Sequence, residues 1–199
     1  MRVIAGSARG ARLKGPPSRG TRPMADKIKG ALFNSLLSLG VEPDRVLDLY
    51  AGTGSIGIEA LSRGARWADF VEQNAAAAEV TRANLRTTRF EQVGRVHQTA
   101  VGTFLTIAAG APYDLVILDP PYADPEIEAT LDRVGRSHLV QSGSVVVIGH
   151  SPRVALSDQM GRLTCLRHRC HGDSCYSIYD VTDDEHGRIT PAGEDARTA

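Results

Sequence analysis

The sequence of 199 residues lacks any apolar segment long enough to cross a membrane. Its purely apolar stretches, such as Val145 to Ile148, span only a few residues, whereas a membrane helix needs about 20. The first residues, MRVIAGSARG, also lack the apolar core of a secretory signal. We therefore expect a cytoplasmic protein with no membrane partner.

Cysteine is scarce as well, and the odd number of three fits a reducing compartment better than a disulfide framework. The cysteines lie near two histidines, in the order Cys165, His168, Cys170, His171 and Cys175. Their spacing lacks the C-x-x-C pair that is typical of structural zinc sites. Because alternate residues of a β-hairpin point to opposite faces, we interpret these side chains as packing residues and predict no metal site.

The chain has no excess of either charge, with 23 basic and 23 acidic residues. A balanced total argues against a nucleic-acid partner, which usually requires a basic surface. The charges are unevenly distributed, however. Residues 2–29 hold eight basic residues against Asp26 alone, a net charge of +7, and residues 180–199 hold six acidic against two basic residues, a net charge of −4. The basic segment is either a solvated surface or a clamp for phosphates.

Apolar runs alternate with helical patterns along most of the chain, which predicts an α/β fold with a doubly wound, mostly parallel sheet. We expect a basic hairpin or loop extension over residues 1–23, a catalytic domain over 24–181 and a disordered acidic tail over 182–199. Two final strands at 162–170 and 175–181 form an antiparallel hairpin, giving a sheet of seven strands. The expected parallel strands are 45–50, 67–72, 95–100, 113–119 and 144–150.

A glycine-rich loop, Gly52-Thr53-Gly54-Ser55-Ile56-Gly57, stands between the first predicted strand and a helix. In this context a G-x-G-x-x-G pattern lets a ligand approach the backbone and the free N–H groups of the helix. Glu72 ends the next strand, where an acidic residue can bind ribose hydroxyls. These features fit both NAD and S-adenosylmethionine. Asp48 favours the latter, since a carboxylate suits a positive amino group better than a pyrophosphate.

A second motif, Asp119-Pro120-Pro121-Tyr122, follows the strand at 113–119. The prolines fix the backbone at the sheet edge where ligands bind in open α/β folds. Asp119 and the Pro120 carbonyl could each accept one N–H of an exocyclic amino group, directing the nitrogen lone pair towards a sulfonium methyl. Tyr122 could stack on the base. The motif therefore predicts methylation of an amino group on a planar base.

At these motifs the sequence resembles class I S-adenosylmethionine-dependent methyltransferases, and more closely the RsmD family of 16S ribosomal RNA guanine-N2 methyltransferases. The resemblance covers about residues 1–181 and rests on RVIAG, DLYAGTGSIGIEALSRGA, FVEQN, DPPY and the closing GDS hairpin. It implies methyl transfer to N2 of guanine 966 of the 16S rRNA, in the small ribosomal subunit or an assembly intermediate. We expect the protein to act as a monomer.

The resemblance also implies roles for individual residues. The catalytic residues would be Asp119, Pro120 and Tyr122. The S-adenosylmethionine site would comprise Asp48, Tyr50, Ala51, Gly52, Gly54, Glu72, Gln73, Ala100, Val101 and Asp119. The RNA would contact Arg9, Arg12, Lys14, Arg19, Arg22 and Tyr122.

The sequence departs from the family pattern at three places. Lys29-Gly30 replaces a helical Arg-Glu pair, and Met24 follows Arg22-Pro23 where the family has threonine. The third strand usually ends in an acidic residue near the adenine, whereas this chain has Ala100. Adenine recognition must then use backbone groups or apolar contacts from this segment.

Three other functions are compatible with parts of the sequence. A DNA adenine-N6 methyltransferase would share the chemistry of the Asp-Pro-Pro-Tyr motif, but the chain has no room for a target-recognition region. An NAD-dependent oxidoreductase would share the glycine loop and Glu72 but leaves that motif unexplained. A non-enzymatic RNA-binding assembly factor is disfavoured by the intact Asp119 and Tyr122.

Overall fold

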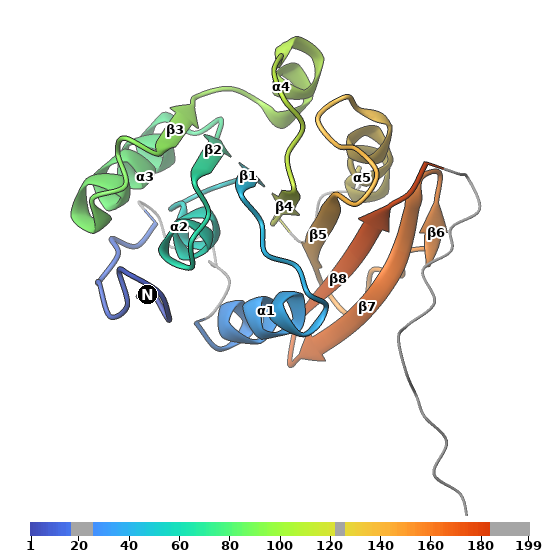
Figure 1. Ribbon diagram of the computed structural model, residues 1–199, viewed down its shortest axis with the longest axis horizontal. Helices are drawn as coiled ribbons and strands as arrows, with labels where there is room; N and C mark the ends of the chain where they lie inside the picture. Colours follow the sequence, from blue (N-terminus) through green and yellow to red (C-terminus); the bar gives the residue numbers. More distant parts are fainter. Residues whose placement is uncertain (17–25, 122–125, 184–199) are drawn as a thin grey trace, which may run out of the picture.

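A computed structural model describes residues 1–16, 26–121 and 126–183 of the chain. Its strands are β1 (Arg45–Leu49), β2 (Trp67–Val71), β3 (Gly94–His97), β4 (Leu115–Leu118), β5 (Val145–His150), β6 (Gln159–Met160), β7 (Leu163–His171) and β8 (Ser174–Val181). They form one sheet in the order β3-β2-β1-β4-β5-β8-β7-β6 (Figure 1). Strands β1 to β5 are parallel, and β8 joins β5 in the antiparallel direction.

One helix precedes the first strand, and the other four lie in the connections between successive parallel strands. They are α1 (Asp26–Ser38), α2 (Ser55–Ser62), α3 (Ala75–Thr88), α4 (Val101–Ile107) and α5 (Ile127–Arg136). Local signals set some of their ends: the side chain of Asn74 accepts a hydrogen bond from the Ala77 N–H (3.0 Å) at the start of α3. The alternation of strands and helices confirms the predicted doubly wound α/β fold.

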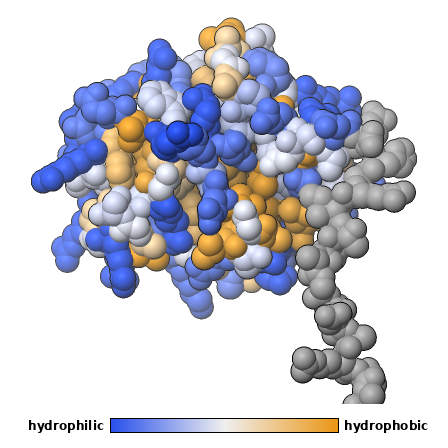
Figure 2. Space-filling model, viewed as in Figure 1, coloured by the Kyte–Doolittle hydropathy of each residue, from blue (hydrophilic) through white to orange (hydrophobic). Residues whose placement is uncertain are grey.

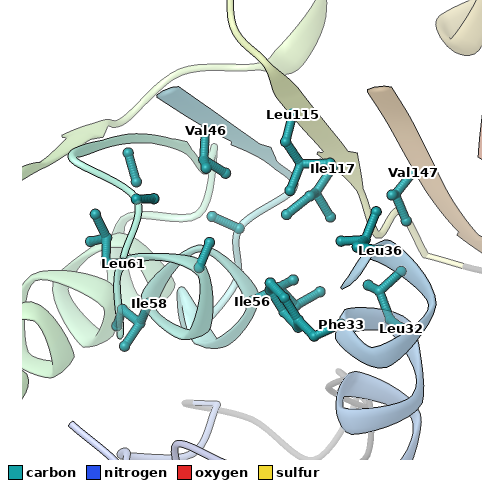
Figure 3. Packing of buried hydrophobic residues seen from close by; sticks show 14 of the residues in the cluster. Leu32, Phe33, Leu36, Val46, Ile56, Ile58, Leu61, Leu115, Ile117 and Val147 are labelled. Carbon is teal, nitrogen blue, oxygen red and sulfur yellow. The ribbon is translucent and has the colours of Figure 1, made fainter. Parts of the chain in front are cut away.

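The sheet is buried on both faces, which is why its central strands read as continuous apolar runs. In β4, Leu115 and Ile117 face the core that also contains residues of α1, α2 and α3, whereas Val116 and Leu118 face the core of α4 and α5. Figure 3 shows Leu32 and Leu36 of α1 beside Ile117 and Val147 of the sheet. This packing fixes the carboxyl ends of β1, β2 and β4, from which the candidate site is built.

The structure differs from the predicted fold in its details. The sheet has an eighth strand, β6, whose two residues are too few to produce a recognisable periodicity. The expected N-terminal hairpin is reduced to one antiparallel bridge between Arg2 and Arg12. Of the predicted tail, the structure describes only residues 182 and 183. Residues 184–199 lie outside the described part of the chain, as do residues 17–25 and 122–125.

The expectation that the cysteines form no disulfide is wrong for one pair. Cys170 and Cys175 face each other across the β7–β8 hairpin and are joined by a disulfide, while Cys165 is free. The sequence spacing alone did not reveal this register. None of the helices in the described part of the chain is both long and apolar enough to span a bilayer. Hydrophilic side chains cover much of the face shown in Figure 2, with apolar patches between them.

Candidate active site

The glycine loop between β1 and α2 has the backbone that the sequence pattern predicts. Gly52 and Gly54 have φ angles of 56° and 74°, in the left-handed region that glycine adopts without strain. Gly54 is also tightly packed, since a Cβ atom there would lie 2.6 Å from Cγ2 of Thr81. The loop therefore requires glycine for its conformation at both positions and for close packing at Gly54.

Asp48, at the fourth position of β1, lies directly beneath this loop. Its side chain is buried, and Oδ2 accepts a hydrogen bond from the Gly57 N–H (2.8 Å) in the first turn of α2. Burial raises the pKa of Asp48 to about 8; the Gly57 hydrogen bond opposes this rise, and the charges of Asp119 and Glu72 reinforce it. Asp48 is therefore a carboxyl group whose ionisation a nearby cation would favour.

Glu72 follows β2 and hydrogen-bonds to the backbone of the glycine loop. Its Oε2 accepts a hydrogen bond from the Gly52 N–H (2.8 Å), and its Oε1 accepts one from the Asn74 N–H (2.7 Å). A carboxylate has about four acceptor positions, so this pair leaves capacity for ligand hydroxyls. The predicted contact between Glu72 and a ribose stays a prediction.

Asp119 and Pro120 follow β4, which lies beside β1 in the sheet. The Asp119 N–H is 3.5 Å from the carbonyl oxygen of Leu49, the last residue of β1. Leu118, the residue before Asp119, pairs with Leu49, the residue after Asp48, so the two aspartates lie on neighbouring strands, and the charge of Asp119 helps to raise the pKa of Asp48. The sheet thus brings the glycine loop, Glu72 and Asp119 to one edge, as the sequence predicts.

Comparison with known proteins identifies the family. The family model described as Conserved hypothetical protein 95 matches residues 1–180. The chain belongs to this family. The resemblance to the RsmD family that the motifs indicate is thereby confirmed.

Similar proteins extend over nearly the whole chain. Ribosomal RNA small subunit methyltransferase D of Escherichia coli K12 is 29% identical over 179 residues, covering 90% of this chain and 89% of that protein. YlbH of Bacillus subtilis 168, named as a candidate rRNA methyltransferase, is 33% identical over 181 residues, covering 90% and 98%. A solved structure of yhhF from Escherichia coli, named as a candidate methyltransferase, has a TM-score of 0.80 and 28% identity, covering 92% and 99%.

The remaining predicted residues of this family member divide into two groups. Tyr50 and Ala51 lead into the glycine loop, Gln73 follows Glu72, and after β3 Ala100 is the N-cap of α4 and Val101 its first residue. All of these positions follow parallel strands at the same edge of the sheet. Tyr122, Arg19 and Arg22 lie outside the described residues.

Sequence reasoning missed two side chains of α3 that hold the loop. The Thr81 hydroxyl donates to the Gly52 carbonyl (2.9 Å), and Nδ2 of Asn84 donates to the Thr53 carbonyl (2.9 Å). Both side chains are fully buried. The available signal was the presence of polar residues at helical spacing on the face of α3 that packs on the sheet.

Asn84 and Glu59 also dock the N-terminal segment on the domain. Oδ1 of Asn84 accepts from the Lys14 N–H (2.7 Å), and Glu59 of α2 accepts from the N–H groups of Ile4 (2.7 Å) and Ala5 (3.0 Å). Val3 is buried in the same core as α1 and α2. These contacts hold residues 1–16 against the domain.

The charges of the basic segment have different environments. Lys29 is fully buried, with Nζ 3.6 Å from Oε2 of Glu59, so it cannot contact RNA. Burial lowers the pKa of Lys29, although the charge of Glu59 acts in the opposite direction. The predicted RNA-contact residues Arg9, Arg12 and Lys14 are exposed. The net charge of the segment thus overstates the charge that is available to a polyanion.

A cavity of about 520 Å³ lies apart from the glycine loop, between the first three strands and α4. Asp69 forms its polar centre and accepts hydrogen bonds from Trp67 Nε1 (2.6 Å) and the Tyr113 hydroxyl (2.8 Å). Burial would raise the pKa of Asp69, but these bonds and the contact with His97 (2.6 Å) outweigh it and lower the pKa. Asp69 thus provides a hydrogen-bond partner for the side chains of Trp67, Tyr113 and His97 in this cavity.

Proposed function

We propose that the chain transfers a methyl group from S-adenosylmethionine to the exocyclic N2 of a guanine in 16S rRNA. By family resemblance the target is guanine 966, in the small ribosomal subunit or an assembly intermediate. The observation that carries the proposal is the placement of Asp48, Glu72 and Asp119 around a left-handed glycine loop. The small-subunit rRNA methyltransferase name of the Escherichia coli relative supports the RNA substrate.

The charge of this edge suits S-adenosylmethionine better than NAD. The carboxyl groups of Asp48, Glu72 and Asp119 favour a ligand that carries a sulfonium and an ammonium, because a cation stabilises their ionised forms, whereas the negative pyrophosphate of a dinucleotide does not. Asp48 and Glu72 would hold the donor, and the backbone of Gly52 and Gly54 would allow its close approach. The donor supplies the electrophilic methyl group.

The acceptor base would lie at the Asp119-Pro120 corner. Pro120 is buried, and its ring fixes the backbone φ angle. Its carbonyl is therefore held in place as an acceptor. Asp119 and this carbonyl would orient the guanine amino group, and Asp119 would oppose the positive charge that develops on nitrogen. Tyr122 would stack on the base.

The test is methylation of small ribosomal subunits that lack the modification. Incubation with the protein and labelled S-adenosylmethionine should place the label on N2 of one guanine of 16S rRNA, identified by nuclease mapping and mass spectrometry. A parallel reaction with protein-free 16S rRNA shows whether the assembled subunit is required. Absence of label from guanine N2 in both substrates contradicts the proposal, and label on adenine N6 of DNA favours the alternative methyltransferase.

Replacing Asp119 with alanine should reduce kcat by about 100-fold, because it removes one acceptor that orients the amino group and opposes its positive charge. RNA binding, measured by filter retention, should remain close to wild type. Unchanged turnover in this variant would show that Asp119 does not take part in the reaction.

Replacing Arg9 and Arg12 with glutamine should weaken RNA binding and reduce its salt dependence, because both side chains are exposed on the docked N-terminal segment. If both contact phosphates, the slope of log K against log[salt] should fall by about 1.5. The matched control is the double variant Arg86→Gln and Arg89→Gln, which removes two exposed positive charges from the end of α3. An equal change in the control would mean that the effect comes from net charge alone.

A further inference from the structure

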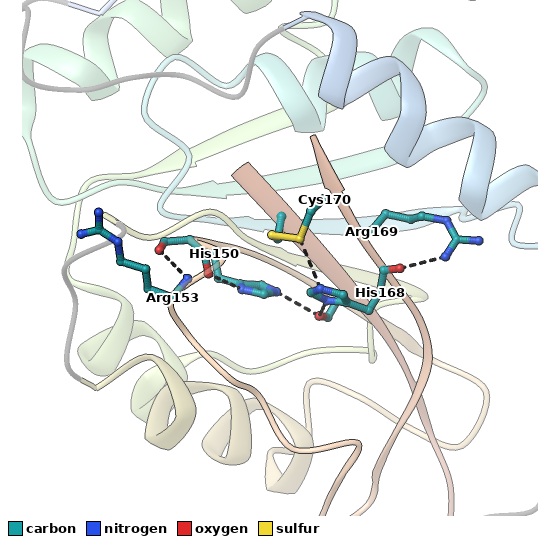
Figure 4. The surroundings of a disulfide bond; sticks show 8 residues. His150, Arg153, His168, Arg169 and Cys170 are labelled. Carbon is teal, nitrogen blue, oxygen red and sulfur yellow. Dashed lines mark hydrogen bonds between the residues drawn. A yellow bond between two sulfur atoms is a disulfide. The ribbon is translucent and has the colours of Figure 1, made fainter. Parts of the chain in front are cut away.

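The tip of the β7–β8 hairpin gathers three side chains that bind soft metal ions. Cys170 and Cys175 are opposite each other in the register of the hairpin, and Nε2 of His168 lies 3.3 Å from Sγ of Cys170 (Figure 4). The two sulfur atoms and a ring nitrogen of His168 lie within 4.8 Å of one another. Contrary to the expectation from alternating residues, the hairpin brings these side chains together, because residues two apart share a face and pair with the same face of the partner strand.

A chain of hydrogen bonds fixes the orientation of the His168 ring. The Ser151 carbonyl can only accept, so Nδ1 of His150 donates to it (3.0 Å). Nε2 of His150 lies 3.0 Å from the Ser177 hydroxyl, which lies 3.1 Å from Nδ1 of His168. With the hydroxyl donating to His150, its oxygen accepts from Nδ1 of His168. His168 is left with a lone pair on Nε2, facing Cys170.

We propose that the reduced hairpin binds a Zn²⁺ ion through Sγ of Cys170, Sγ of Cys175 and Nε2 of His168. Two thiolates and one imidazole suit Zn²⁺, and they leave its fourth position open to water. Ser177 is the positioning residue, because it binds the ring nitrogen of His168 that does not face the metal.

The site exists only in the reduced state of the protein. A dithiol reductant transfers two electrons and two protons to the Cys170–Cys175 disulfide and itself becomes a disulfide. Zn²⁺ then displaces the two thiol protons into solvent as the two metal–sulfur bonds form. A disulfide oxidant reverses the sequence: it accepts two electrons and two protons and becomes a dithiol, the Cys170–Cys175 sulfur–sulfur bond forms from the two thiolates, and the metal is released.

The site lies near the edge of the sheet that carries the candidate active site. His150 ends β5, in which Ile148 pairs with Leu118, the residue before Asp119. His168 and Cys170 are exposed, whereas Cys175 is fully buried. Metal ions can therefore reach the site from solvent, and the buried sulfur fixes one side of it.

The experiment measures metal binding to the full chain after reduction with a phosphine and removal of the reductant under anaerobic conditions. Titration with Co²⁺ should produce the charge-transfer absorption of cobalt–thiolate bonds and saturate at one equivalent, and Zn²⁺ should displace the cobalt. The same protein kept in its disulfide form should bind neither ion. The proposal is wrong if the reduced protein shows no thiolate band or if the oxidised protein binds equally well.

Variants separate this site from other thiols and imidazoles of the chain. Cys170→Ser and His168→Gln should each weaken Zn²⁺ binding by more than about 100-fold, and Ser177→Ala by about 10-fold. Cys165→Ser and His171→Gln are the matched controls on the same strand and should bind as wild type. Because Cys170 is exposed, its variant should fold even if a Cys175 variant does not. Equal weakening by Cys165→Ser would overturn the assignment.

Discussion

The Asp48→Asn variant should unfold at a higher urea concentration than the wild-type protein, and its advantage should increase with pH. Asp48 is fully buried and its folded pKa is raised to about 8 by burial. Between pH 4 and this value the folded state holds a proton that the unfolded state releases, so the wild-type protein loses up to about 1.4 kcal/mol of stability per pH unit. Asparagine is always neutral and avoids this loss.

We expect the variant to be more stable by about 2–4 kcal/mol at pH 8, and by much less at pH 5. The amide oxygen can still accept the Gly57 N–H, while burial of the additional N–H donors reduces the gain. Urea unfolding of both proteins at the two pH values measures the difference. An equal difference at pH 5 and pH 8 would show that Asp48 does not titrate in this range.

The same substitution should impair binding of S-adenosylmethionine. A cationic donor favours ionised Asp48, so binding near pH 7 should release a proton and strengthen by up to tenfold per unit as the pH rises towards 8. Calorimetry in two buffers of different ionisation enthalpy should find nearly one more proton released by the wild-type protein than by Asp48→Asn. The amino group of the donor contributes equally to proton release with the wild-type protein and with the variant. The difference in released protons between the two proteins therefore reports Asp48 alone.

The sequence predicted the parallel sheet and the edge at which its motifs meet, because both follow from local patterns. The glycine spacing predicts a strand-turn-helix, and the strand order then brings Glu72 and Asp119 beside it. Gly52 and Gly54 have the left-handed backbone that the pattern requires.

The parts that the sequence did not predict depend on contacts between distant segments. Asn84 hydrogen-bonds to Lys14, 70 residues away, and no periodicity in either segment reveals this contact. The pairing of Cys170 with Cys175 depends on the register of the hairpin, which the turn residues alone do not fix. The sequence also places Lys29 in the basic N-terminal segment. Its burial depends on an ion pair with Glu59 of another helix, which the sequence does not reveal.

Glu59→Ala should destabilise the protein by about 3–5 kcal/mol, because it leaves the buried ammonium of Lys29 without its carboxylate partner. The loss also removes the acceptor of the Ile4 and Ala5 N–H groups. The N-terminal segment should therefore detach more readily, and amide hydrogen exchange at residues 3–5 should accelerate. Urea unfolding and exchange measured by mass spectrometry report the two effects separately.

Arg63→Gln is the matched control, because Arg63 binds the same carboxylate (2.8 Å) but has a partly exposed side chain. It should cost no more than about 1 kcal/mol. The double variant Lys29→Met and Glu59→Gln should recover part of the stability lost in Glu59→Ala, since no buried charge remains and glutamine can still accept from the N-terminal backbone. If Glu59→Ala proved no more harmful than Arg63→Gln, the buried ion pair would not be what docks the N-terminal segment.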